Sequence, residues 1–145
     1  MVSLLLCVAG LADATYLTFE HYTQSASLLC SDKGTINCLA VTTSSYSDFH
    51  GAPVALLGLL YFVGMTALCL PVAWRLPALR WVRMIGATTG VLFVFYLVWA
   101  ELFRINAICL WCSGVHVITI LLFGVVLFAT VMAQPSAAES PGADD

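Results

Sequence analysis

Residues 107–132 read AICLWCSGVHVITILLFGVVLFATVM, the longest apolar stretch of the chain, and contain no aspartate, glutamate, lysine or arginine. A helix rises about 1.5 Å per residue, so this stretch is long enough to cross the ~30 Å hydrocarbon core of a bilayer. It also contains Cys109 and Cys112, a Cys-x-x-Cys pair, which in soluble proteins is typical of redox or metal chemistry. The stretch therefore predicts a membrane-spanning helix that begins with two thiols.

The rest of the chain has the composition of a membrane protein. Its 145 residues are 61% hydrophobic and 9% charged, against about 25% charged in an average soluble domain. Three further apolar stretches, at residues 2–19, 54–73 and 84–103, are near the length that a spanning helix needs. The first lacks a basic leader and is interrupted by Asp13, which favours a span over a cleavable signal peptide. We expect an all-α fold, a membrane four-helix bundle formed by residues 1–133.

The few charges predict how the bundle is oriented. Three of the five basic residues, Arg75, Arg80 and Arg83, lie in the link between the second and third predicted spans. The positive-inside rule places this link and both termini in the cytoplasm, and residues 20–53 outside. So few basic residues give no footprint for nucleic acid. Residues 134–145 are rich in alanine, proline and acidic residues and are expected to be a disordered tail.

The outer segment, residues 20–53, is too short and too rich in serine, threonine and glycine to form its own core. Its best helical piece is residues 37–43, which follow a turn signal at residues 32–34. Pro53 is acceptable in the first turn of a helix, so the second span is expected to start there. We expect this segment to cap the outer end of the bundle.

The chain has six cysteines, at positions 7, 30, 38, 69, 109 and 112. Cys7 and Cys69 lie within predicted spans and are expected to behave as small hydrophobic residues. The other four all fall on the outer side in the predicted topology. Disulfides persist outside the cytoplasm, so the topology and the redox environment agree.

Three interpretations compete for these four cysteines. A zinc site needs four ligands, but the Cys30-x7-Cys38 spacing is unusual for one, and we expect no metal. Two inert disulfides suit the loop pair, yet a disulfide within the first turn of a helix closes almost no chain and stabilises little. Reactivity is the favoured explanation for Cys109 and Cys112, because the start of a helix favours a thiolate.

A third side chain shares the helical face of these two thiols. Cys109, Cys112 and His116 follow the spacing i, i+3, i+7, which leads from the water interface into the apolar layer. Such a stripe can exchange disulfides with outer thiols and pass two electrons to a lipid-soluble acceptor, of which a quinone is the obvious example. His116 either donates a hydrogen bond to a quinone oxygen or is a buried histidine with a structural role.

The combined pattern resembles the vitamin K epoxide reductase family over about residues 5–130. The matching features are four predicted spans, the pair Cys30-x7-Cys38, Ser44 six residues later, the run GAPVALLGLLYF and the pair Cys109-Leu-Trp-Cys112 in the last span. The run is more similar to the bacterial branch than to the animal one. We expect no fused thioredoxin-like domain of the kind that some bacterial members carry, and therefore a partner that is a separate protein.

The resemblance implies a relay of electron pairs. Cys30 would accept electrons from a thioredoxin-like partner outside the membrane, and Cys38 would exchange with Cys109. Cys112 would deliver the electrons to menaquinone, ubiquinone or vitamin K, and Ser44 would polarise groups beside the site. The implied location is a bacterial plasma membrane with the active site facing the periplasm or exterior, the alternative being the membrane of the endoplasmic reticulum.

The resemblance also suggests residues that bind the quinone. Tyr46 and Phe49 belong to the loop segment expected to cover it, and Pro53 and Tyr61 bound the region where animal members use an asparagine that has no secure counterpart here. His116 stands where vertebrate members have a tyrosine, which places inhibitor contacts of the warfarin type in doubt but leaves the relay intact.

Two rival functions remain open. One is a non-enzymatic tetraspan protein whose disulfide-stapled outer loop binds a partner. The other keeps the same thiol chemistry but has a different physiological role, in which partner thiols drive the reduction of vitamin K or its epoxide. Among the remaining charged residues, Asp13 is expected to anchor structure or relay protons, and Glu101 and Arg104 are expected to be interfacial anchors.

Overall fold

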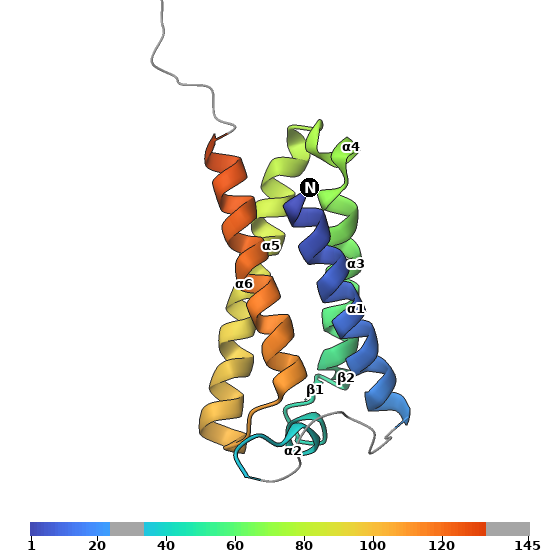
Figure 1. Ribbon diagram of the computed structural model, residues 1–145, viewed down its shortest axis with the longest axis vertical. Coiled ribbons are helices and arrows are strands. Elements are labelled where there is room, and N and C mark those ends of the chain that lie inside the picture. The colour runs from blue at the N-terminus through green and yellow to red at the C-terminus, as the bar shows by residue number, and fades with distance from the viewer. Residues whose placement is uncertain (24–33, 133–145) are drawn as a thin grey trace, which may run out of the picture.

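The computed structural model describes residues 1–23 and 34–132. Four helices form a bundle: α1 (Val2–Thr23), α3 (Val54–Cys69), α5 (Ala78–Ala100) and α6 (Leu110–Met132). Helix α1 packs against α3 and α6, and α5 closes the bundle against α6 and α3 (Figure 1). The short elements of the described chain are α2 (Cys38–Thr42), β1 (Asp48–Phe49), β2 (Ala52–Pro53), α4 (Pro71–Trp74) and the π-helical turn η1 (Glu101–Ile105). The prediction of an all-α four-helix bundle is confirmed.

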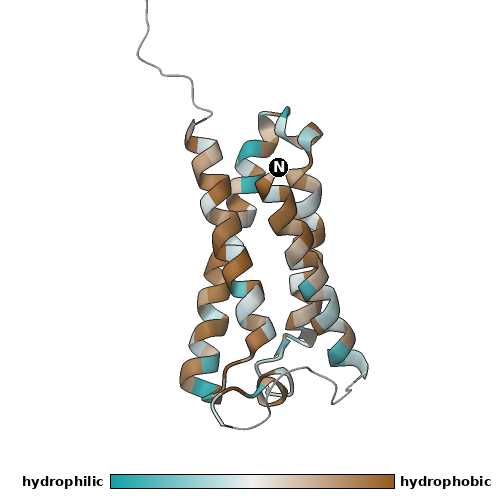
Figure 2. Ribbon diagram, viewed as in Figure 1, coloured by the Kyte–Doolittle hydropathy of each residue, from teal (hydrophilic) through white to brown (hydrophobic). Residues whose placement is uncertain are grey.

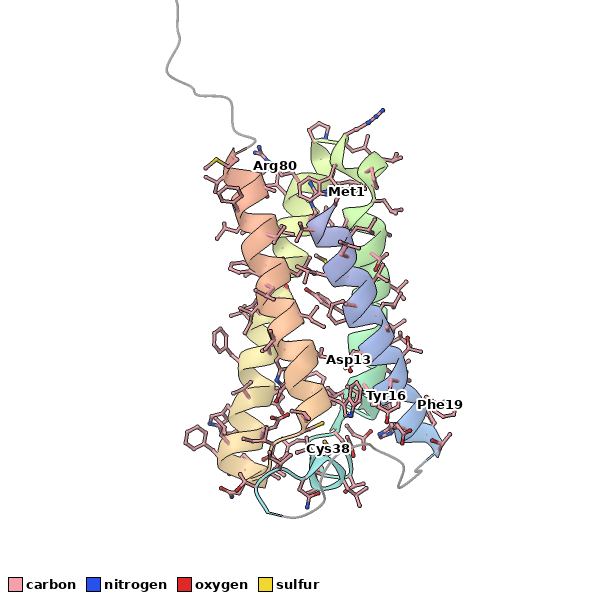
Figure 3. The ribbon with its side chains drawn as sticks, in the orientation of Figure 1. Met1, Asp13, Tyr16, Phe19, Cys38 and Arg80 are labelled. Atoms are coloured by element: carbon pink, nitrogen blue, oxygen red, sulfur yellow. The ribbon has the colours of Figure 1, made fainter. Side chains whose placement is uncertain are left out.

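The two ends of the bundle differ. The N-terminus, α4 and the end of α6 lie at one end, and α2 with the small hairpin β1–β2 lies at the other (Figure 1). Met1 and Arg80 are near the first end and Cys38 is at the second (Figure 3). The chain therefore traverses the bundle four times, with the arginine-rich link on the side opposite the cap.

Three helical segments of the described chain are long and apolar enough to cross a membrane: α1, the continuous segment of α5 and η1, and α6. Apolar residues dominate along them, as Figure 2 shows. Helix α3 has 16 residues, about 24 Å at 1.5 Å per residue, and ends earlier than the predicted residues 54–73. Leu70 leaves the helical conformation, with φ −59° and ψ 145°, because the proline that follows disfavours a helical residue before it.

The core at the uncapped end contains polar groups that the sequence does not bring together. The thiols of Cys7 and Cys69, from α1 and α3, are hydrogen-bonded to each other. Arg83 is buried; its Nη1 donates to the carbonyl of Leu68 at 3.0 Å. Its guanidinium carbon lies 3.6 Å from the ring centre of Trp74. Both residues are buried in the hydrophobic core, as expected of small hydrophobic residues, but their pairing across two helices is not predicted by the sequence.

The cap begins with the predicted short helix. Asn37 caps α2, and its side chain accepts a hydrogen bond from the backbone N–H of Ala40 at 2.9 Å, so the helical prediction for residues 37–43 is confirmed. Strands β1 and β2 pair antiparallel. They are joined by His50 and Gly51, whose φ angles of 53° and 85° suit a two-residue turn. Helix α3 begins one residue after Pro53, close to the predicted start.

Candidate active site

A short parallel bridge joins the cap to the segment that precedes α6. Ile36 pairs with Ile108, the N–H of Asn37 donates to the carbonyl of Ile108 at 3.1 Å, and the N–H of Ile108 donates to Thr35 at 2.9 Å. This pairing fixes the register of the two segments. It places Cys38, the first residue of α2, beside Cys109.

Cys38 and Cys109 share one buried cluster, with exposed fractions of 1% and 0%. The backbone N–H of Leu110 donates to the Sγ of Cys38 at 3.3 Å. Cys38 is disulfide-bonded, whereas Cys109 and Cys112 are free thiols. Cys30 lies outside the described residues.

Cys109 occupies the N-cap position of α6. Its Sγ accepts a hydrogen bond from the backbone N–H of Cys112 at 3.2 Å, as a capping side chain does. The pKa of the Cys109 thiol is lowered, first by the hydrogen bond from the side chain of Cys112 and then by the backbone N–H groups of Cys112 and Trp111, which outweigh burial. Of the two thiols, Cys109 is the one held ready as a thiolate.

Cys112 faces a different environment. A cavity of about 320 Å³ lies between the helices beneath the cap, within the size range of about 300–1,000 Å³ of small-molecule sites. Most of its wall is apolar. The predicted site residues on this wall are Ser44, Tyr46, Phe49, Tyr61, Cys112 and His116. Neither Cys109 nor Pro53 belongs to it, so one thiol of the pair faces the cavity and the other faces Cys38.

The wall carries a polar group without a partner. The hydroxyl of Tyr61 is buried, and no hydrogen-bond partner for it lies in residues 1–23 and 34–132, which is rare in a folded protein. It lies against Gly90 of α5, where even a Cβ atom would collide with it. His116, 6% exposed, lies on α6 one turn beyond Cys112. An apolar cavity with these few polar groups fits a flat, apolar ligand whose oxygens take hydrogen bonds.

The cap is held over the cavity by contacts with the end of α5. The Nε of Arg104 donates to the hydroxyl of Tyr46 at 2.7 Å. The ring of Phe49 meets those of Phe93 and Tyr96 edge to face, with ring centres 5.7 and 6.2 Å apart. The hydroxyl of Ser44 is used inside the cap, where it donates to the carbonyl of Val41 at 2.8 Å.

A sequence model of the vitamin K epoxide reductase family matches residues 1–127. The chain belongs to the vitamin K epoxide reductase family. This confirms the resemblance drawn from the order of the cysteines. Membership of the vitamin K epoxide reductase family, together with the long apolar helices, supports a membrane-embedded thiol–disulfide oxidoreductase.

The expectation that Glu101 anchors the chain at the membrane interface is wrong. Glu101 is 6% exposed, lines the cavity, and its carboxylate accepts a hydrogen bond from the backbone N–H of Cys109. The sequence does contain one indication of this role. Glu101 lies within an apolar stretch, where burying a carboxylate costs free energy and usually serves a function. Arg104, three residues later, is exposed and contacts the cap rather than a carboxylate.

Asp13 lies midway along α1 (Figure 3). Its Oδ1 is buried without a hydrogen-bond partner. A Cβ atom at Gly114 would lie 2.9 Å from its Oδ2, so this glycine makes room for the carboxylate beside α6. Among the described residues no group of three or more histidine, cysteine or acidic side chains is placed to hold a metal ion.

Proposed function

We propose that this protein passes electron pairs between a thioredoxin-like partner outside the membrane and a quinone in the bilayer, through two pairs of cysteines. One observation carries the proposal. Cys112 lies on the wall of an apolar cavity, while Cys109, at the start of the same helix, packs with Cys38 of the cap. A single turn of α6 thus separates a contact for thiol exchange from a contact for a membrane-soluble acceptor.

The proposed exchange follows from the chemistry of thiols. A thiolate attacks a disulfide sulfur and expels the other sulfur. Reduced Cys38 attacks Cys109 of the Cys109–Cys112 disulfide, and Cys112 leaves as a thiolate. Cys30 then attacks Cys38 and releases Cys109. The described state, with Cys38 in a disulfide and Cys109 and Cys112 free, corresponds to the stage after this transfer.

The proposed quinone site is the 320 Å³ cavity. A bound quinone accepts two electrons and two protons from the thiol pair. Tyr61 offers a buried hydroxyl that has no hydrogen-bond partner among the described residues, and His116 lies on the same wall beside Cys112. Tyr46 and Phe49 cover the cavity from the cap, and Ser44 lies on the wall nearest α2. Menaquinone, ubiquinone and vitamin K all have the flat apolar ring that this site requires.

The rival function, a stapled outer loop that only binds a partner, gives no reason for a free thiol on a cavity wall. Reduction of vitamin K or its epoxide would draw on the same cysteine relay. Reduction of the quinone yields hydroquinone, whereas reduction of the epoxide breaks a C–O bond and yields the quinone and water, so the product identifies the substrate. We propose that the active site faces the periplasm or exterior, because the arginine-rich link is at the end of the bundle opposite the cap. The similarity of the run GAPVALLGLLYF to the bacterial branch favours a bacterial plasma membrane over the membrane of the endoplasmic reticulum.

Trapping of an exchange intermediate tests this proposal. In a Cys112→Ser variant, Cys109 has no partner within its own pair, so we expect a Cys38–Cys109 disulfide to accumulate and to be seen by mass spectrometry of proteolytic fragments. Re-oxidation of a reduced thioredoxin-like protein in quinone-containing membranes should be lost. Cys69→Ser serves as the matched control. Full re-oxidation by Cys112→Ser would refute the relay.

A further inference from the structure

Glu101 is a buried carboxylate at membrane depth. It lies in the apolar segment Ala78–Ile105, is 6% exposed and forms part of the cavity wall. Ionisable groups within spans are expensive and mark proton or ion paths more often than structural sites. Its carboxylate is bound by the backbone N–H of Cys109, and its charge acts on both Cys109 and Cys112, so this side chain lies between the cavity and the thiol pair.

The backbone around Glu101 is unusual. Residues Glu101–Ile105 form a π-helical turn, which ends at Asn106 with a left-handed φ of 54°. The N–H of Ala107 closes the turn by donating to the carbonyl of Glu101 at 3.2 Å. π-Helical turns are rare and are found mostly at functional sites. Here the turn directs the chain from the end of α5 straight to Cys109.

The proposed function creates a need for a proton carrier. Oxidation of the Cys109–Cys112 dithiol releases two electrons and two protons, and the quinone must receive both. Cys112 faces the cavity and can release its proton there. Cys109 is 0% exposed and is not part of the cavity wall, so its proton needs an intermediate group.

We propose that Glu101 carries the proton of Cys109 to the quinone oxygen in the cavity, an inference that rests on the proposed function. Cys109 becomes a thiolate when its S–H bond breaks and the proton moves to an Oε of Glu101. The S–S bond to Cys112 then forms, the electron pair passes to the quinone, and Glu101 gives its proton to a quinone oxygen. The second proton comes from Cys112. Glu101 ends each cycle as the carboxylate with which it began.

Other titratable groups share this environment. Those on the cavity wall are His21 of α1, Tyr46 of the cap, Tyr61 of α3, and Cys112 and His116 of α6. Asp13 faces α6 at Gly114, and Arg104 lies one turn beyond Glu101. Of the described side chains on the wall, Glu101 is the one bound to the backbone of Cys109, which is the geometry that a carrier for the Cys109 proton needs.

Two half-reactions measured separately test this role. The first is reduction of a soluble quinone by pre-reduced protein, and the second is exchange between the oxidised protein and a reduced thioredoxin-like protein without quinone. The variant Glu101→Gln keeps a side-chain oxygen that accepts the hydrogen bond from the N–H of Cys109. In this variant we expect quinone reduction to slow at least about tenfold, as loss of a positioned acid–base group does. The dependence of its rate on pH should also change. The first half-reaction should slow by a larger factor than the second, and Glu101→Asp should recover part of the first. An unchanged quinone half-reaction in Glu101→Gln would overturn the inference.

The result separates this inference from the proposed function. If wild-type protein reduces no quinone, both the proposed function and the proton path are refuted. If Glu101→Gln reduces quinone as fast as the wild type, only the proton path is refuted. A second measurement follows quinone reduction in time. Time-resolved infrared spectra of pre-reduced protein mixed with a soluble quinone should contain a transient band of a protonated carboxyl group that is missing in Glu101→Gln. If that variant fails to fold, wild-type spectra without a transient carboxyl band overturn the inference.

Discussion

At the scale of single residues, Cys109 and Cys112 differ in chemistry although they are three positions apart. The Sγ of Cys109 accepts the hydrogen bonds that stabilise a thiolate at the start of α6, while Cys112 faces the cavity. This division suits a relay in which one sulfur exchanges with the cap and the other delivers electrons. It also identifies which of the two thiols should titrate at the lower pH.

The titration of Cys109 provides the first prediction. In a Cys7→Ser, Cys69→Ser background, ultraviolet absorption should show thiolate forming below the pH at which an ordinary cysteine ionises. The additional change Cys112→Ala removes the largest stabilising hydrogen bond, so the pKa of Cys109 should rise toward its ordinary value. An identical titration curve in both proteins would show that Cys112 does not hold the thiolate.

Gly10 provides a prediction about packing. A Cβ atom at this position of α1 would collide with the ring of Phe62, which is 0% exposed and packed in the hydrophobic core. Gly10→Ala should therefore lower the unfolding free energy by about 1–3 kcal/mol, as overpacking does. The matched control is Gly64→Ala on α3, where nothing lies within 4 Å and the better helix propensity should leave stability equal or higher. Thermal unfolding in detergent measures both, and equal effects would contradict this packing.

The sequence predicts several of these residues and misses others. Spacing alone singles out Cys109 and Cys112 and aligns His116 with them, because three side chains on one helical face follow from helix geometry. Glu101 could not be placed, since its burial depends on the π-helical turn that carries the chain from α5 to Cys109. No periodic pattern in the sequence indicates that turn.

At the scale of elements, the cap is a separate unit that must sit over the cavity. The bridge between Ile36 and Ile108 fixes one side of it, and the hydrogen bond between Arg104 and Tyr46 fixes the other. Sequence signals predict α2 through its capping Asn37. Hydropathy overestimates the length of α3, because the apolar stretch continues through Pro71 although the helix ends before it.

The contact between Arg104 and Tyr46 provides a prediction about the cap. Arg104→Gln should loosen the cap, because the guanidinium both donates to the Tyr46 hydroxyl and lies 5.9 Å from the ring centres of Tyr46 and Trp99. Hydrogen–deuterium exchange should accelerate several-fold in α2 and the hairpin, and the KM for quinone should rise more than kcat falls. Arg80→Gln, at the opposite end of the bundle, is the control. Equal rates of hydrogen–deuterium exchange in the cap of both variants would show that the contact between Arg104 and Tyr46 does not hold the cap.

At the scale of the whole molecule, composition predicts the fold class and the number of crossings, because an almost uncharged chain can only be solvated by a bilayer. The distribution of arginines predicts which end lies opposite the cap. The thiol pair of Cys7 and Cys69 is not predictable in this way. This pair depends on how α1 packs on α3, and hydropathy does not indicate which residues of two apolar helices contact each other.

The central claim is that one molecule joins the thiol pair to a membrane quinone. Protein whose Cys109–Cys112 pair is reduced while Cys38 remains in its disulfide should convert one quinone to hydroquinone per protein in lipid nanodiscs that contain menaquinone. The loss of quinone absorption measures this conversion, and mass spectrometry should find Cys109 joined to Cys112. Cys112→Ser should produce none, and Cys69→Ser should match the wild type. Hydroquinone formation by Cys112→Ser at the wild-type rate would contradict the account.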